Sequence, residues 1–222
     1  MGVDVEINEN IDIEFIENIQ KNNRSGRVHR KFMCVFGAIF TVSLVFGFLI
    51  SISAQRAISE ELRVQMADHF TNVFEGCSAP ADYITVIITS STADLRYVLL
   101  IFTAGFTFFC KYATGAMIAI RAFSIGFCSE FLIISLREGI IDLDHPVVSF
   151  AIFLLSELLI AALLVYLSVK STIFGYDFRR LRGRKSLILR SPVIYRYIFL
   201  FSTAIGYSIS VNAAYCALSS LI

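Results

Sequence analysis

The sequence predicts an all-α fold: a polytopic membrane bundle of about five transmembrane helices, with the N-terminus inside and the C-terminus outside. Two observations predict this class. Of the 222 residues 56% are hydrophobic and only 3 are proline, and the apolar residues gather in five long segments. A helix of about 20 apolar residues crosses ~30 Å of hydrocarbon, where only helices and closed barrels satisfy every backbone hydrogen bond. The segments are Phe32–Ala54, Leu95–Cys110, Ala113–Leu136, Val147–Val169 and Tyr197–Leu221.

The charged residues predict the orientation of the bundle. Lysine and arginine concentrate in short loops on the cytoplasmic side of a membrane. The tail 1–31 holds six acids and then five bases, and residues 170–196 hold eight bases against Asp177 alone. Residues 55–94 and 137–146 carry more acids than bases. We therefore expect the tail and the basic loop 170–196 to be cytoplasmic, in a multi-pass protein of the cell membrane.

The first 54 residues predict a tail and an uncleaved signal anchor. Small residues at the end of the first segment would suit a cleaved signal peptide, but 31 residues precede an apolar run of about 22. Signal peptides have apolar regions of about 7–15 residues, so we favour the anchor. In the acidic tail Val and Ile alternate with acids, which predicts a short strand or a disordered tail that folds on a partner; we favour disorder.

The outside segment 55–93 begins with a predicted amphipathic helix over residues 55–76. Ser59 can cap this helix and Gly76 is a natural stop. An apolar residue recurs every four positions along one face, as in a helix that buries one side. This stripe lies on the bundle or the bilayer surface, which we favour, or it docks an external partner protein. The candidates for partner docking are Ile58, Leu62, Met66, Phe70 and Phe74.

The second and third segments predict a helical hairpin. Ser91 fits an N-cap and Asp94 the capping-box position, so the second helix is expected to begin there. Lys111 and Tyr112 then predict a tight turn on the inside.

Small residues at four-residue spacing mark two helix faces. Lipid provides no hydrophobic drive between helices, so close backbone approach through small residues is how they associate. The faces either pack the bundle or serve a homo-oligomer or partner helix. They comprise Ser43, Gly47 and Ser51 in the first segment, and Ser202, Gly206, Ser210 and Ala214 in the fifth.

Four polar residues are predicted to lie within the membrane: Arg121, Glu130, Glu157 and Asn212. An ionisable group there costs about 2.5–3.5 kcal/mol on insertion scales and is a functional candidate. Arg121 and Glu130 are nine positions apart, roughly 180° around a helix, so they cannot pair. We expect Arg121 to pair with Glu157; alternatively, Glu157 is protonated and bonded to Asn212. We favour a structural pair, with a transport or proton pathway, or contact with a partner, as the alternatives.

No enzyme chemistry is predicted. His29, His69 and His145 lie far apart in loops, without a nucleophile arrangement or a Gly-rich phosphate loop. The five cysteines show no CxxC or Cys/His spacing, so we expect no metal site, cofactor or disulfide framework. The basic loop is interpreted as the positive-inside signal, with some attraction to anionic lipid, and not as a nucleic-acid site.

Several residues between 94 and 133 follow a family pattern. Arg96-Tyr97, Gly105, Arg121 and Gly126-Phe127 stand where the stage II sporulation protein M family tends to have a basic-aromatic pair, a glycine, a basic residue and Gly-Phe. Residues 30–222 also resemble that family in layout: one helix, an outside stretch, a hairpin, a fourth helix, a basic loop and a final helix.

The pattern is kept only in part. Ala122 replaces a glycine common after the basic residue. Glu157 fits the end of a Pro-His-Gly-x-x-Glu pattern whose first three positions are here Ile152, Phe153 and Leu154.

The resemblance implies a non-enzymatic membrane scaffold. Such a protein would recruit peptidoglycan hydrolases during engulfment or cell-wall remodelling, and its outside helix 55–76 would meet them. The second hypothesis is a transporter or permease subunit that uses Glu157 and Arg121. A membrane-embedded enzyme comes third, since no nucleophile or metal set is visible.

Overall fold

The chain forms a helical bundle, and this confirms the predicted all-α class. The computed structural model describes residues 3–55, 57–78, 83–141, 145–181 and 192–221. Five of the helices in these residues are long and apolar enough to cross a membrane, and α2 is the exception. The helices are α1 (Val3–Gln55), α2 (Glu60–Ser78), α3 (Tyr83–Ala104), α4 (Cys110–Arg137), α5 (Pro146–Leu181) and α7 (Pro192–Ser219).

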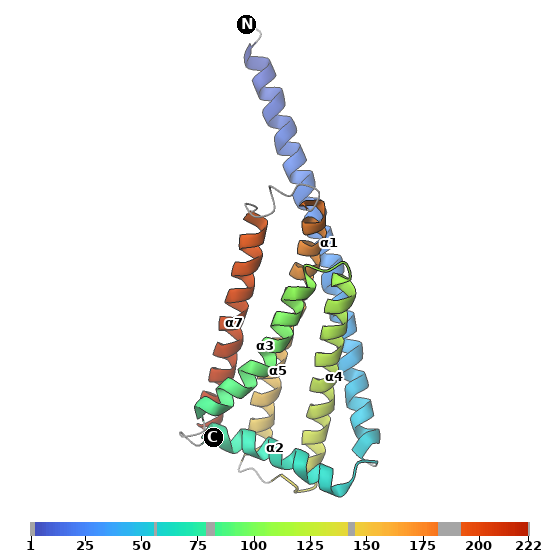
Figure 1. Ribbon diagram of the computed structural model, residues 1–222, viewed down its shortest axis with the longest axis vertical. Coiled ribbons are helices and arrows are strands. Elements are labelled where there is room, and N and C mark those ends of the chain that lie inside the picture. The colour runs from blue at the N-terminus through green and yellow to red at the C-terminus, as the bar shows by residue number, and fades with distance from the viewer. Residues whose placement is uncertain (1–2, 56, 79–82, 142–144, 182–191, 222) are drawn as a thin grey trace.

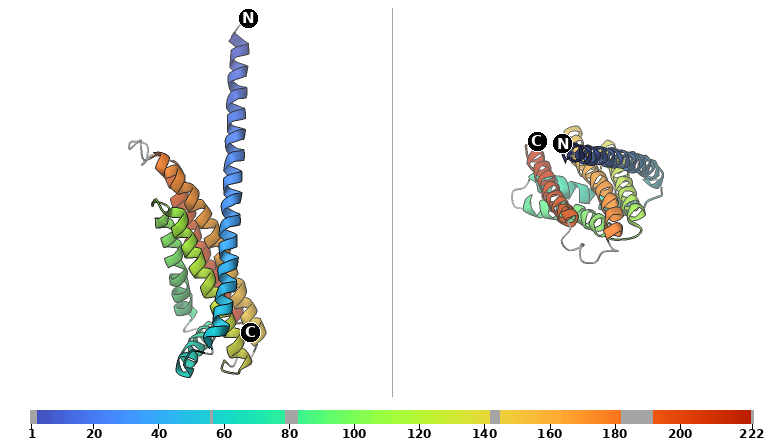
Figure 2. Two further views of the ribbon diagram at one scale, coloured as in Figure 1. Left: turned by 90° about the vertical axis from the view of Figure 1, so that its right-hand side faces the viewer. Right: turned by 90° about the horizontal axis from the view of Figure 1, so that it is seen from above.

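The five long helices lie side by side, and α2 lies across one end of them (Figure 1). The two termini lie at opposite ends of the bundle, as an odd number of crossings requires. Helix α1 continues well beyond the other helices at the N-terminal end (Figure 2). Following the charge distribution of the sequence, we call the end that carries α2 the outer end and the opposite end the inner end.

The acidic tail is helical, so the prediction of disorder or a strand is wrong. Helix α1 begins at Val3 and runs without a break into the first span. The first 55 residues contain no proline, the residue that most strongly interrupts a helix. Extension from an already formed helix also avoids the nucleation step that limits short helices in isolation.

Helix α3 begins at Tyr83, eight residues before the predicted N-cap at Ser91. Ser91 and Asp94 therefore lie inside the helix and do not cap it. The polar run 89–92 does not interrupt the helix, because its threonines bond to their own helix. Thr89 Oγ1 donates to the carbonyl of Thr85 (2.8 Å), and Thr92 Oγ1 donates to the carbonyl of Ile88 (2.6 Å). The outside segment thus ends before residue 83, not at 93.

The inside turn also lies earlier than predicted. Helix α3 ends at Ala104, and Lys111 and Tyr112 belong to the first turn of α4. The hydroxyl of Tyr197 donates to the carbonyl of Phe102 (2.9 Å) in the last turn of α3. A Cβ atom on Gly105 would lie 2.2 Å from that hydroxyl oxygen, so the close approach of Tyr197 requires glycine where the chain turns.

The predicted basic loop is shorter than 170–196. Helix α5 continues to Leu181 and α7 starts at Pro192, so both ends of the loop are helical. Residues 182–191 lie outside the described residues.

The inner half is packed around a large apolar cluster, which we call the inner cluster. Each member is at most 4% exposed, and the ring of Tyr197 stacks on Phe174 with centroids 3.9 Å apart. Side chains of this cluster pack the inner halves of α3, α5 and α7 against one another. It comprises Val98, Ile101, Ile160, Leu164, Leu167, Phe174, Tyr197, Phe201 and Ala204.

The two small-residue faces have different surroundings. A Cβ on Gly47 would lie 2.2 Å from the carbonyl oxygen of Phe123, and one on Gly126 would lie 2.1 Å from that of Leu44. The face on α1 therefore packs against α4. A Cβ on Gly206 of α7 would meet nothing within 4 Å, so this second face points away from the rest of the described chain.

Helix α2 packs on the outer end of the bundle, as favoured above. Ser59 Oγ accepts the N–H of Leu62 (3.4 Å) and caps the helix as predicted. Phe74 is buried, and the ring of Phe70 stacks on Phe131 with centroids 6.0 Å apart. An ion pair between Arg63 and Glu138 joins α2 to the outer end of α4.

This packing divides the candidates for partner docking. The bundle covers Phe74 and packs against Phe70, whereas Leu62 remains 45% exposed. Ile58 and Met66 are partly buried. Partner docking by this helix stays a prediction.

Candidate functional site

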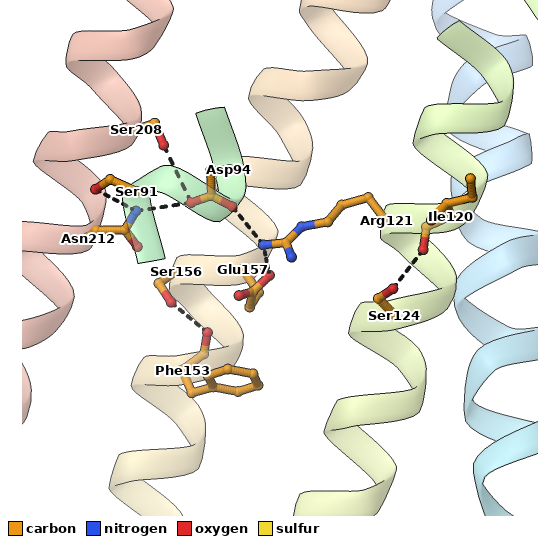
Figure 3. Close-up of polar contacts among 10 residues, drawn as sticks. All are labelled: Ser91, Asp94, Ile120, Arg121, Ser124, Phe153, Ser156, Glu157, Ser208 and Asn212. Atoms are coloured by element: carbon orange, nitrogen blue, oxygen red, sulfur yellow. Dashed lines mark hydrogen bonds and ion pairs between the residues drawn. The ribbon is translucent and has the colours of Figure 1, made fainter. Parts of the chain in front are cut away.

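Charged and polar side chains from four helices meet in the middle of the bundle (Figure 3). Arg121 of α4 donates through Nη2 to Asp94 Oδ1 of α3 (2.9 Å) and to Glu157 Oε2 of α5 (2.7 Å). The predicted pair between Arg121 and Glu157 is therefore present. The polar cluster, as we name it, consists of Ser91, Asp94, Arg121, Glu157, Ser208 and Asn212.

Asp94 is the residue that sequence reasoning missed. Its side chain is 3% exposed, and besides Arg121 it accepts hydrogen bonds on Oδ2 from Asn212 Nδ2 (3.0 Å) and Ser208 Oγ (3.4 Å). Asn212 also donates to Ser91 Oγ (3.3 Å), so the alternative that it bonds to Glu157 is wrong. The apolar run that follows Tyr83 could have indicated that the helix begins there. Asp94 would then have been predicted to lie halfway through a membrane span.

Glu130 does not belong to the polar cluster. It is 7% exposed on α4, in the half of that helix nearer the outer end, and it has no hydrogen bond or ion pair within the described part of the chain. This agrees with the expectation that Arg121 and Glu130 point in different directions.

The polar cluster carries unequal charge. Asp94 and Glu157 supply two carboxylates against the single guanidinium of Arg121. Both oxygens of Asp94 accept hydrogen bonds, but Glu157 Oε1 has no partner among the described residues. Arg121 also lies over the ring of Tyr97, with Cζ 5.6 Å from the ring centroid, which adds a cation–π contact.

A cavity of about 440 Å³ lies between α2 and the polar cluster. His69 and Asn72 of α2 line it near the outer end, Thr89 lines it partway, and Asp94, Arg121, Glu157 and Asn212 are among the residues that line its inner part. Small-molecule sites in proteins have volumes of roughly 300–1,000 Å³ and combine apolar walls with a few placed polar groups. The outer cavity, as we call it, has both properties.

On the inner side of the polar cluster the packing is apolar and tight. Val98 follows Asp94 by one turn of α3, and Ile160 and Leu164 follow Glu157 along α5; all three are 2% exposed or less. Buried hydroxyl groups resume only beyond them, where Ser171 Oγ donates to the carbonyl of Ile101 (2.8 Å). The outer cavity therefore ends at the charged residues.

No family model, curated protein or solved structure matches this chain. The described residues also contain no group of three or more His, Cys, Asp or Glu side chains placed to hold a metal ion.

Proposed function

We propose that the protein carries a small solute across the membrane, as a transporter or as the membrane subunit of a permease. The observation that carries this proposal is the asymmetry about the polar cluster. The outer cavity reaches Asp94, Arg121 and Glu157 from one side, and the inner cluster closes the other side. A carrier that holds its solute near the middle of the membrane and opens to one side at a time requires this arrangement.

The alternative is that the polar cluster only ties helices together. Burying an ion pair in a membrane costs several kcal/mol per ion in desolvation, so such residues are rare and mark solute or proton paths. A structural tie needs a satisfied pair and no space around it. Here one carboxylate oxygen of Glu157 has no partner among the described residues, and Glu157 lines a cavity of ligand size. This favours a ligand-binding role.

Substitution of Glu157 tests the proposal. Cells of the native host that carry wild-type protein, a deletion or Glu157→Gln would be compared by mass spectrometry for solutes in the cell and in the medium. We expect Glu157→Gln to reproduce the solute change of the deletion while the protein is inserted normally. Glu130→Gln is the matched control, because this buried carboxylate lies outside the cavity, and it should behave as wild type.

Solutes that accumulate in the deletion, or fail to enter it, would then be tried in proteoliposomes. Wild-type solute levels in the Glu157→Gln strain would contradict the transport proposal.

The second candidate is the membrane scaffold that the resemblance to stage II sporulation protein M implies. Two observations favour it: Leu62 and Val64 of α2 are each 45% exposed at the outer end, and Arg121 and Glu157, which both match the family pattern, are in contact. On this hypothesis the exposed residues Leu62 and Val64 of α2 contact peptidoglycan hydrolases and recruit them. Crosslinking followed by mass spectrometry should capture wall hydrolases with wild type and lose them with the double change Leu62→Glu, Val64→Glu. Equal capture by both would remove this candidate.

A further inference from the structure

We propose that the outer cavity binds an organic cation, with an ammonium group beside Glu157 and an apolar body against the aromatic wall. This inference rests on the proposed function and names the class of solute. Three features of the cavity carry it: its net charge, the position of the free carboxylate oxygen and the composition of its walls.

The net charge of the cavity is negative. Among the Asp, Glu, Lys and Arg residues that line it in the described part of the chain, Asp94 and Glu157 are acidic and Arg121 is basic, which leaves one excess negative charge. An anionic ligand would add a second uncompensated charge in a medium of low dielectric constant, whereas a cation would neutralise the first. Buried charges in proteins are paired, so the cavity selects for a positive partner.

The excess charge is exposed to the cavity at Glu157. Both oxygens of Asp94 have partners, because Arg121 donates to Oδ1 and Asn212 and Ser208 donate to Oδ2. Glu157 receives one bond, from Arg121 to Oε2, and its Oε1 has no partner among the described residues. Arg121 Nε also has no hydrogen-bond partner in the described part of the chain, but that atom is fully buried and therefore offers no anion site to a ligand in the cavity. An ammonium N–H donor fits the remaining acceptor.

The walls favour an organic ion over a metal ion. Phe153 lies against Phe70 and Phe74, with ring centroids 6.1 and 6.4 Å apart, and all three residues line the cavity. Aromatic faces attract cations and cover apolar groups. A bare Ca²⁺ would need six to eight oxygen ligands, and the described residues hold no group of three side chains placed for a metal. A volume of about 440 Å³ also far exceeds that of one ion.

Cys128 provides a native probe, because it is a free thiol that lines the same cavity. In a Cys77→Ser background, intact cells would be treated from outside with a cationic trimethylammonium-ethyl methanethiosulfonate or an anionic sulfonatoethyl methanethiosulfonate. Relative to a small free thiol, we expect the cationic reagent to be favoured at Cys128 by about tenfold or more, since a charged cleft concentrates counter-ions by 10- to 1,000-fold. Cys128→Ser is the blank.

Charge variants identify the source of the preference. At Cys128, the ratio of the rate with the cationic reagent to the rate with the anionic reagent should fall close to that of the free thiol in Glu157→Gln. Glu157→Asp and Glu130→Gln should keep the preference for the cationic reagent. If Glu157→Gln fails to insert, Thr89→Lys serves instead, because it adds a positive charge at an exposed position in the cavity lining. Thr89→Lys should lower the ratio as well, and an unchanged ratio would overturn the inference.

Ligand protection completes the test on purified wild-type protein. Phenethylammonium should slow the reaction of Cys128 with the neutral reagent N-ethylmaleimide, and 2-phenylethanol at the same concentration should not. Equal protection by the two compounds, or a preference for the anionic thiosulfonate, would overturn the inference and leave a solute of another class. If neither thiosulfonate modifies Cys128 from outside, both the inference and the outward-open cavity of the proposed function fail.

Discussion

The inner and outer halves of the bundle use the same four helices, α3, α4, α5 and α7, in opposite ways. In the inner half the inner cluster fills the space between α3, α5 and α7 with aliphatic and aromatic side chains, and Met117 of α4 packs against it. In the outer half the same helices, covered by α2, surround a cavity that ends at three charged residues. The tightly packed inner cluster and the outer cavity are thus separated along the long axis of the bundle, with Arg121 at the boundary between them.

Removal of the positive charge at the boundary between the two halves should have the largest effect on stability. Arg121→Met leaves Asp94 and Glu157 buried without a cation, and loss of one partner of a buried ion pair costs about 3–5 kcal/mol. We expect a loss of that size in the free energy of unfolding in bicelles. The triple change Arg121→Met, Asp94→Asn, Glu157→Gln should restore most of it, because no charge remains. A triple variant as unstable as the single one would contradict this.

A change at the inner turn should have the next largest effect. Gly105→Ala places a Cβ 2.2 Å from the Tyr197 hydroxyl oxygen, and the stacking of that ring on Phe174 resists a shift. Such overpacking costs about 1–3 kcal/mol. Thermal unfolding in detergent should show this loss, and Tyr197→Phe in the same chain should recover part of it. Gly206→Ala is the matched control, since its Cβ meets open space, and it should be neutral or slightly stabilising.

Substitution of two valines on α3 compares the packing of the two halves directly. Val98 of α3 is 1% exposed in the inner cluster, whereas Val86 of the same helix is partly buried and lines the cavity. Val98→Ala removes packed methyl groups and should cost about 1–2 kcal/mol of unfolding free energy. Val86→Ala should cost below about 0.5 kcal/mol, because its side chain already borders empty space. Equal losses in an unfolding titration would mean that the two halves are packed alike.

The smallest effect is expected at the contact that fastens α2. Arg63 pairs with Glu138, whose side chain is 47% exposed, and exposed ion pairs contribute roughly 0–1 kcal/mol. Arg63→Gln should therefore lower stability by less than about 1 kcal/mol, and the difference from wild type should shrink at high salt. A loss above about 2 kcal/mol that is independent of salt would show that α2 is held by this pair and not by the packing of Phe74.

Much of the fold follows from hydrophobicity and charge in the sequence. Long apolar runs specify spanning helices, and the stripe on α2 with its Ser59 cap predicted a helix that lies on the bundle. The boundaries at Tyr83 and Ala104 were missed, because hydroxyl groups that bond to their own helix resemble a cap, and because the end of α3 depends on the distant Tyr197.

The site was predictable only in part. Arg121 and Glu157 stand out because charge is rare in apolar segments, and adjacent helices made their pairing a reasonable expectation. Asp94 was not predicted as an intramembrane residue, because the predicted start of α3 at Ser91 placed it in the first turn of the helix. The outer cavity could not be predicted, since it exists where α2 crosses over residues from four other helices, and no local pattern records how those helices diverge.

On the proposed function, the cavity opens to the outside as far as the polar cluster while the inner half is sealed. Helix α4 carries a native thiol in each half: Cys128 lines the cavity, and Cys110 is fully buried near the inner end. Intact cells would be treated with the membrane-impermeant cationic thiosulfonate, and the α4 peptides analysed by mass spectrometry. We predict modification of Cys128 and none of Cys110. An unmodified Cys128, or equal modification of both, would contradict a cavity that is open to the outside above a sealed inner half.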